Sequence, residues 1–167
     1  MNKMDLSMYI KEDILFQSIN SLLTQDNNIP YSFLEKINHL AKADLTVFYK
    51  TNISSKNNFK FTFKIGSYET PKIIKCKIEV ISFLKESNEI IFLNKNNSAI
   101  FSELFLNEEM NSLVAFPINY SGKLYGVIII NFLNENALNK KNIILIEKFK
   151  NFIDRFFLKN NNVLSKN

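Results

Sequence analysis

Apolar residues recur along the chain at two different spacings, which predict helices in some stretches and strands in others. Leu6–Leu23, Pro30–Ala43 and Asn139–Leu158 repeat apolar residues at intervals of three and four, as one face of an α-helix requires. Ser32 and Glu35 have the spacing of a capping box near the start of the second stretch. The sequence therefore predicts three amphipathic helices, two before the strands and one after them.

Short runs rich in β-branched and aromatic residues lie between these helices and predict β-strands. In Phe59–Ile65 the apolar residues alternate with Lys and Thr, so we expect one buried side and one side that faces solvent. Gly122 suits the positive φ of a tight turn between the last two runs, and this hairpin is the clearest pattern in the chain. The predicted strands are Leu45–Lys50, Phe59–Ile65, Ile90–Leu93, Leu113–Ile118 and Leu124–Leu133.

Pro71–Val80 fits two patterns, and the sequence leaves both open. Cys76 and Ile78 alternate with lysines as in a strand, whereas Ile74 and Ile78 also have the spacing of a helix. We expect extended structure to about Ile78, followed by a short helix over Glu79–Ser87.

The order of helices and strands predicts an α+β fold. Another short helix, capped by Ser98, is expected over Ser98–Leu106. Two hairpins imply antiparallel pairing of the strands. A chain of 167 residues suits one such domain. We expect this domain over residues 30–158, after an N-terminal helix and linker over residues 1–29 and before a flexible tail over residues 159–167.

Charge and composition exclude several classes of function. The net charge is +5, but the basic residues are scattered lysines and one arginine, Arg155, whereas nucleic-acid readers gather arginine in clusters. The longest apolar run, near Val127–Ile130, is far shorter than a membrane span, and the first residues lack the apolar core of a secretory signal. A single cysteine suits a reducing compartment. We therefore expect a cytoplasmic protein that binds neither nucleic acid nor membrane.

The residues that could carry catalysis or hold a metal ion are isolated in the sequence. No carboxylate or second ligand can be paired with His39, the one histidine. Cys76 lies on the apolar side of its alternating stretch, which favours an inert core thiol over a reactive one. We expect no catalytic residue, no metal site and no cofactor, and hence a protein that is not an enzyme.

The last hairpin and the helix after it resemble the closing half of a GAF domain. Ser112–Ile118, then Gly122–Ile128, then an amphipathic helix carry this resemblance. The upstream half agrees, with a helix before the first strand and a short helix before Ile90–Leu93. The resemblance extends over about Pro30–Leu158.

The resemblance implies a six-stranded or similar central antiparallel sheet, with the terminal helices on one face and short helices over a small-molecule pocket on the other. Bilin-binding members attach their pigment to a cysteine commonly followed by histidine, whereas Cys76 is followed by Lys77. Free-methionine-sulfoxide reductases of this fold use several cysteines, and the Asn-Lys-x-Phe-Asp-Glu signature of cyclic-nucleotide-binding members is absent. A sensory or regulatory role without these chemistries is therefore implied.

The resemblance also implies where a small ligand would bind, on the sheet face opposite the terminal helices. Aromatic residues are common in the elements that would wall this pocket. The implied ligand-binding residues are Phe63, Phe92, Ser98, Phe101 and Phe116. The alternative function is a protein-interaction or dimerisation module with a collapsed pocket that these side chains fill.

The two ends of the chain carry apolar stripes that are wider than one buried face needs. These stripes lie in Leu6–Leu23 and Phe149–Leu158. We expect the surplus surface to bury itself in a homodimer, or against a protein partner. The alternative is a monomer in which the first helix folds back over the last one.

Overall fold

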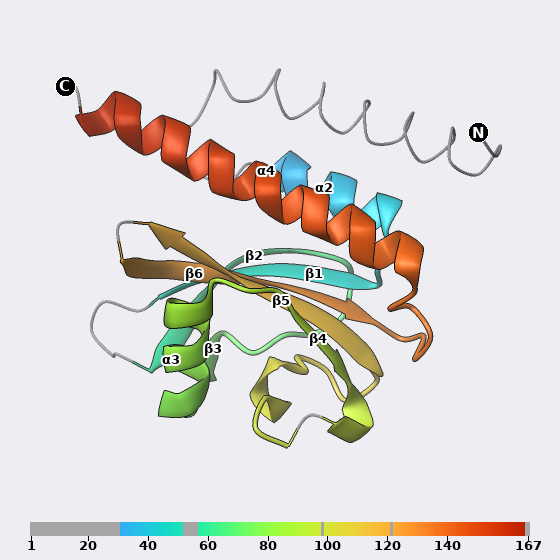
Figure 1. Cartoon of the computed structure of the whole chain (residues 1–167). Coiled ribbons are helices and arrows are strands. Elements are labelled where there is room, and N and C mark those ends of the chain that lie inside the picture. Colours follow the sequence, from blue (N-terminus) through green and yellow to red (C-terminus); the bar gives the residue numbers. More distant parts are fainter. Residues whose placement is uncertain (1–30, 52–56, 98, 121, 166–167) are drawn as a thin grey trace, which may run out of the picture.

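The structure, a computed structural model, describes residues 31–51, 57–97, 99–120 and 122–165, and side chains as far as Phe156 apart from that of Tyr120. These residues form a six-stranded antiparallel sheet in the order β3-β2-β1-β6-β5-β4 (Figure 1). The strands are β1 Leu45–Thr51, β2 Asn58–Ile65, β3 Ile73–Lys75, β4 Ile91–Asn94, β5 Ser112–Tyr120 and β6 Lys123–Phe132. The predicted α+β fold with an antiparallel sheet is confirmed. The predicted helix over Leu6–Leu23 lies outside the described residues.

Helices and turns cover both faces of the sheet (Figure 1). α2 and α4 lie across one face, and α3 and two 3₁₀ turns lie on the other, which agrees with the division of helices between the two faces that the GAF resemblance implies. α2 already includes Tyr31, so Ser32 is inside the helix and the predicted capping box is wrong. The elements are α2 Tyr31–Leu40, α3 Ile78–Ser87, α4 Lys140–Ser165 and the 3₁₀ turns Lys95–Asn97 and Ser102–Leu104.

Each face of the sheet has its own core, and the two cores differ in composition. The core under α2 and α4, called the helical core below, contains the buried phenylalanines Phe33, Phe48, Phe116, Phe132, Phe149, Phe152 and Phe156. The core on the other face, called the α3 core below, is largely aliphatic, and its fully buried aromatic residues are Tyr49 and Phe59.

β2 does not keep the strict alternation that its sequence predicts. Phe61 lies opposite Tyr49 of β1, while Phe63 lies opposite Phe48, so Thr62 is an extra residue in a β-bulge. Directly opposite residues of an antiparallel pair share a face. The first half of β2 therefore packs into the α3 core, and the second half packs into the helical core. The prediction of one apolar face for this strand is wrong, because the bulge turns its second half over.

The predicted C-terminal helix is confirmed as α4. It begins at Lys140, and the backbone N–H of Asn142 donates to Asn139 Oδ1 at 3.0 Å, so Asn139 caps the first turn. The helix continues to Ser165, which lies beyond the predicted end near Leu158. No helix in the described part of the chain, α4 included, is long and apolar enough to cross a membrane.

The connection between β4 and β5 differs from its prediction. The α-helix expected over Ser98–Leu106 is reduced, in the described residues 99–106, to the 3₁₀ turn Ser102–Leu104. Leu104 ends that turn, Phe105 after it is extended at φ −77° and ψ 96°, and Leu104 and Leu106 are both buried in the α3 core. Burial against the sheet has overridden the local helical pattern.

Pro71–Val80 resolves into the expected extended segment followed by a helix. β3 ends at Lys75, α3 begins at Ile78, and Cys76 is buried between them as its alternation predicts. Ile78 was expected on the same apolar side, but its side chain is 65% exposed because the change to helical backbone points it away from the core.

Candidate functional site

A groove of about 890 Å³ lies between α3 and the ends of three neighbouring strands. Thr51 ends β1, Asn58 begins β2 and Lys123 begins β6, so the sheet forms one wall and α3 forms the other. This volume lies within the range of about 300–1,000 Å³ that small-molecule sites occupy. The lining residues are the apolar Phe59, Ile78, Ile81 and Leu124, the uncharged polar Thr51, Asn57, Asn58 and Ser82, and the charged Lys85, Glu86 and Lys123.

The groove combines an apolar floor with a charged rim. Phe59 is fully buried at its base, whereas Lys85 of α3 and Lys123 of β6 are exposed on its two walls. Two cations on facing walls attract an anionic group, and Glu86 is the acidic residue among the lining side chains. The exposed Ile78 adds apolar surface at the rim. On this chemistry the groove suits a ligand with an apolar body and an anionic group.

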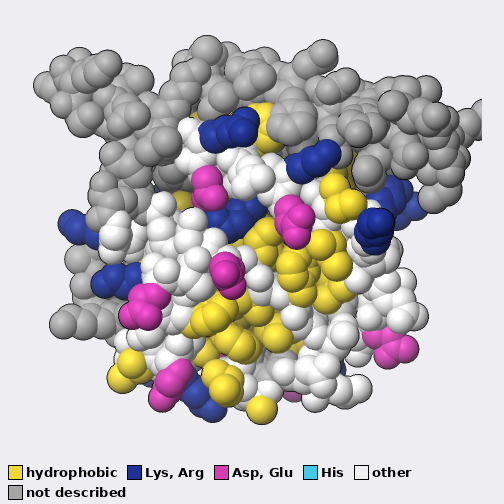
Figure 2. Space-filling model, in the orientation of Figure 1, with side chains coloured by type: hydrophobic (Ala, Val, Ile, Leu, Met, Phe, Trp, Pro, Cys, Tyr) yellow, Lys and Arg dark blue, Asp and Glu magenta, His cyan; other side chains and the backbone are white. Residues whose placement is uncertain are grey.

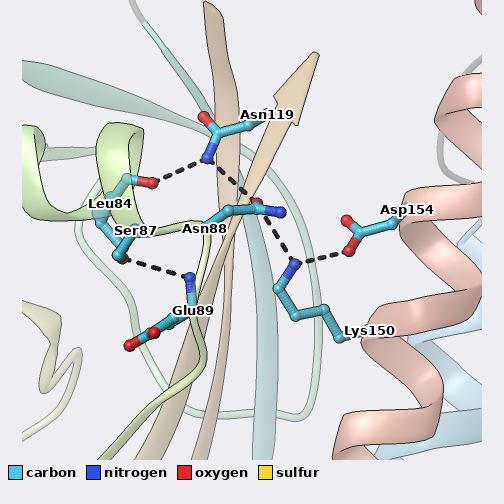
Figure 3. Close-up of polar contacts among 7 residues, drawn as sticks. All are labelled: Leu84, Ser87, Asn88, Glu89, Asn119, Lys150 and Asp154. Atoms are coloured by element: carbon cyan, nitrogen blue, oxygen red, sulfur yellow. Dashed lines mark hydrogen bonds and ion pairs between the residues drawn. The ribbon is translucent and has the colours of Figure 1, made fainter. Parts of the chain in front are cut away.

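The C-terminal end of α3 is tied to α4 by a chain of polar contacts (Figure 3). Asn88 ends α3 in the left-handed region at φ 52°, and its Oδ1 accepts hydrogen bonds from Asn119 Nδ2 at 3.2 Å and Lys150 Nζ at 3.4 Å. Asn119 Nδ2 also donates to the backbone oxygen of Leu84 at 2.8 Å. Lys150 Nζ forms an ion pair with Asp154 Oδ2 at 2.8 Å. One asparagine side chain thereby joins α3, β5 and α4.

Lys150 is the charged residue that this chain of contacts buries. It is 5% exposed, whereas the side chain of its partner Asp154 is 34% exposed. Removing a cation from water costs several kcal/mol, and an ion pair recovers that cost only with good geometry and further hydrogen bonds. A hydrophobic residue of similar size could fill the same space at no such cost. The contact therefore contributes more to the relative position of α3 and α4 than to stability.

Besides Lys150 of α4, one polar residue of the α3 core is buried in an unusual way. Asn131 of β6 is fully buried, and neither its side-chain nitrogen nor its side-chain oxygen has a hydrogen-bond partner. It lies opposite Leu45 on β1 and Leu113 on β5, so its amide points into the aliphatic α3 core. A buried amide without partners costs about 1–3 kcal/mol. This face of the sheet is therefore less stable than its apolar packing alone would make it.

The two residues with the chemistry of a reactive site do not form one. Burial, and to a lesser extent the charge of Glu103, raises the pKa of the Cys76 thiol to about 12, so the thiol stays protonated at neutral pH. This agrees with the inert core thiol that the sequence predicts. His39 is exposed on α2. Within the described residues no group of three or more His, Cys, Asp or Glu could hold a metal ion.

Three of the five residues predicted to bind a ligand lie on the opposite face of the sheet. Phe63, Phe92 and Phe116 all pack into the helical core. The ring of Phe116 meets that of Phe149 on α4 at 6.0 Å, and the ring of Phe63 meets that of Phe48 at 5.7 Å. The expectation that they share the face opposite the terminal helices is wrong. The bulge in β2 turns Phe63 over, and strand register places the other two on the face that α2 and α4 cover.

The remaining two predicted residues do not complete a pocket. Phe101 lies on the α3 face, where its ring contacts that of Phe83 at 5.9 Å. Ser98 lies outside the described residues. Ligand binding by either residue remains a prediction.

Sequence reasoning did not find the residues that line the groove. Ile78, Ile81 and Lys85 all lie on the short helix α3, and the mixture of apolar and basic residues there is a weak signal. Lys123 is separated from them by β4 and β5, and no local pattern relates it to α3. Only the folded sheet brings the two lysines to one groove.

The sequence itself matches no known protein family, and a search of curated proteins finds no significant match. Solved structures do match. A phycocyanobilin-bound GAF domain from a cyanobacterial phytochrome has a TM-score of 0.69 at 11% identity, over 89% of this chain and 96% of that chain. The GAF domain of an Acinetobacter phosphoenolpyruvate-protein phosphotransferase has a TM-score of 0.63 at 15% identity, over 98% of each chain.

An enzyme shares the same architecture. The free methionine-R-sulfoxide reductase of Neisseria meningitidis, solved in complex with its substrate, has a TM-score of 0.64 at 10% identity, over 94% of this chain and 93% of that chain. Identities at this level show a shared fold, and one fold can host both binding and catalysis.

Proposed function

We propose that this chain, which has the fold of GAF domains, is a non-catalytic sensory or regulatory domain that binds a small ligand in the groove beside α3. The observation that carries the proposal is the pairing of Lys85 and Lys123 across an apolar floor that includes Phe59. The matching phytochrome domain is itself solved with a small molecule bound. The ligand proposed here is a compact molecule with an apolar body and a carboxylate or phosphate group.

The chemistry of Cys76 supports the non-catalytic part of the proposal. A thiol acts as a nucleophile or reductant through its thiolate, and a pKa raised to about 12 leaves little thiolate at neutral pH. Cys76 is also the one cysteine in the sequence, so it has no second thiol in the chain with which to form a disulfide. Its free thiol fits the cytoplasm, which remains our proposed location.

The contacts of Asn88 supply a route from the groove to α4. The groove lies along α3, and α3 ends at Asn88, whose side chain accepts a hydrogen bond from the buried Lys150 of α4. A ligand that shifts α3 would therefore shift the partner of a buried cation, and α4 would have to respond. The proposed output of the domain is a change in the position of α4.

Homodimerisation through the terminal helices is part of the proposal in a narrower form than the sequence suggested. The apolar stripe of α4 is buried in the helical core as far as Phe156, and that part offers no surplus surface for pairing. Pairing through the chain ends would then rest on Leu6–Leu23 and on the side chains of Phe157 and Leu158, which lie outside the described part of the chain. Substituting lysine at Phe149 or Phe156 would unfold the domain rather than test pairing.

Thermal-shift screening of the full chain with anionic metabolites tests ligand binding. A ligand at about 100 times its Kd stabilises the folded protein by about 2.7 kcal/mol, which a melting curve resolves. We expect the shift to disappear in the variant Lys85→Ala/Lys123→Ala. The matched control is Lys36→Ala/Lys140→Ala, which removes the same charge from exposed sites on α2 and α4. A shift that persists in the groove variant would place the site elsewhere.

A second function, an interaction module without a ligand, is favoured by the packing of the α3 core. Leu84 and Val80 of α3 are buried against the sheet, so the space beneath the helix is filled by side chains. In that case the groove is a surface feature only. No anionic metabolite would then stabilise the protein, and the groove variant would melt like the wild type.

A further inference from the structure

The two open edges of the sheet carry different charges. β3 forms one edge and is surrounded by the exposed lysines Lys72, Lys75 and Lys77, a device that keeps other strands from pairing. β4 forms the other edge and has no charged residue within Ile91–Asn94. This edge lacks the protection that β3 has.

Apolar side chains gather at the surface beside β4. Figure 2 shows an apolar patch in the region where Figure 1 places β4 and β5, between α4 and α3. Ile90, Phe92 and Leu93 of this edge are only half-buried, and Phe83 of α3 is exposed. A patch of this kind next to a free strand edge is a typical interaction surface.

The backbone of β4 presents hydrogen-bonding groups to solvent at a defined position. The N–H of Lys95 donates to the backbone oxygen of Asn111 at 3.0 Å, so Lys95, and by alternation Leu93 and Ile91, direct their backbone groups toward β5. The N–H and C=O of Phe92 therefore point out of the sheet. No strand in the described part of the chain pairs with this side of β4.

We propose that a second copy of this chain pairs with β4 along this edge, antiparallel, with the two-fold axis at Phe92. Phe92 then exchanges both backbone hydrogen bonds with Phe92 of the other copy, and the two rings form a cross-strand aromatic pair. In the same register Ile91 faces the other copy's Leu93. The two sheets become continuous, and the contact is isologous because each copy contributes the same surface.

The charges that flank β4 select this arrangement. Glu89 lies two residues before β4 and Lys95 directly follows it, so a two-fold axis at Phe92 brings each Glu89 near the other copy's Lys95, just beyond the ends of the paired strands. Both side chains are exposed. Lys95 Nζ also donates to the backbone oxygen of Glu108, which holds the cation beside the strand. A parallel pairing in the same register would set like charges opposite each other, and pairing through β3 would bring the lysines of both copies together.

The interface is small, which sets the strength of the association. β4 has four residues, so the contact falls below the roughly 1,200 Å² of a stable interface and belongs with weak, reversible complexes. We expect a monomer–dimer equilibrium that depends on protein concentration. Because neither β4 nor its flanking charges line the groove, this proposal stands or falls independently of ligand binding.

Sedimentation velocity on the full chain, from about 1 µM to about 500 µM, tests the proposal over the range expected for a weak interface. The wild type should pass from the mass of one chain to that of two. Glu89→Lys and Lys95→Glu each set like charges opposite each other twice per dimer, and each should weaken association on the order of tenfold. The double variant Glu89→Lys/Lys95→Glu restores opposite charges and should restore the dimer. Glu135→Lys makes the same charge change in an exposed loop and should have no effect.

The variants that reverse the charges of Glu89 and Lys95 distinguish pairing through β4 from association through a different surface. A mass of one chain at every concentration would overturn the proposal. So would a wild-type dimer that both single variants leave unchanged, since that dimer would use another surface such as Leu6–Leu23. Circular dichroism establishes that each variant is folded, and a folded double variant that stays monomeric would also contradict the pairing of Glu89 with Lys95.

Discussion

On one face of the sheet two helices bury a cluster of phenylalanine rings, and on the other face one short helix and two 3₁₀ turns cover a mainly aliphatic core. The helical core has complementary ring contacts, such as those of Phe33 with Phe156 and Phe116 with Phe149. The α3 core contains an unpartnered Asn131, a buried thiol and a groove along its border. We therefore expect the first face to contribute more to stability, and we propose that the second supplies the surface that responds to a ligand.

The largest expected difference between the faces is in the cost of truncating an aromatic side chain. Phe149 is fully buried between α4 and the sheet, so Phe149→Ala should lower the free energy of unfolding by about 3–5 kcal/mol. Phe101 on the α3 face is half-buried, and Phe101→Ala should cost about 1 kcal/mol. Urea unfolding of both variants measures the two values. Equal losses would contradict the difference in burial between these two rings.

The two partners of the ion pair between Lys150 and Asp154 should differ in what their substitution does to the free energy of unfolding. Asp154→Ala leaves Lys150 buried beside one amide oxygen, and we expect a loss of about 2 kcal/mol, below the value for a fully buried pair because Asp154 is partly exposed. Lys150→Met replaces the cation with an apolar side chain of similar length and should be close to neutral. Amide hydrogen exchange at the end of α3 should nevertheless rise in Lys150→Met. Unchanged exchange there would show that Lys150 does not hold α3.

The α3 core should become more stable when its unpartnered amide is removed. Asn131→Leu keeps the size of the side chain and replaces two unsatisfied polar atoms, so we expect a gain of about 1–2 kcal/mol. Asn131→Asp is the matched control and should destabilise the protein at neutral pH, because it buries a charge without a partner. Thermal melts of the two variants should therefore move in opposite directions. A loss of stability in Asn131→Leu would mean that the amide has a partner.

The smallest expected effect is the pH dependence that Cys76 gives the α3 face. Its pKa is raised from 9.0 to about 12 on folding, so the folded state holds the proton more tightly than the unfolded state. The stability that the protonated thiol gives the folded state is complete below pH 9 and is lost as the pH rises from 9 toward 12. The free energy of unfolding should fall by about 1 kcal/mol by pH 10. The difference in unfolding free energy between wild type and Cys76→Ala should follow this course. A difference that stays constant with pH would contradict the shift.

The sequence by itself determined most of the elements and their order, because helices and strands depend largely on the local spacing of apolar residues. The helix expected over Ser98–Leu106 is the exception. The hairpin around Gly122 is present with φ at +75°, and α2 and α4 bury the stripes that their patterns predict. The family resemblance held for the same reason, since it rested on elements that adjacent residues define.

Only the tertiary structure decided which face each side chain occupies. A bulge at Thr62 adds one residue to the strand and thereby exchanges the faces of everything after it, although the sequence pattern shows no interruption there. The predicted ligand-binding set was divided between the two cores for this reason and because strand register places Phe116 under α4. The groove that unites Lys85 with Lys123 likewise depends on β1 pairing with β6, which no spacing along the chain encodes.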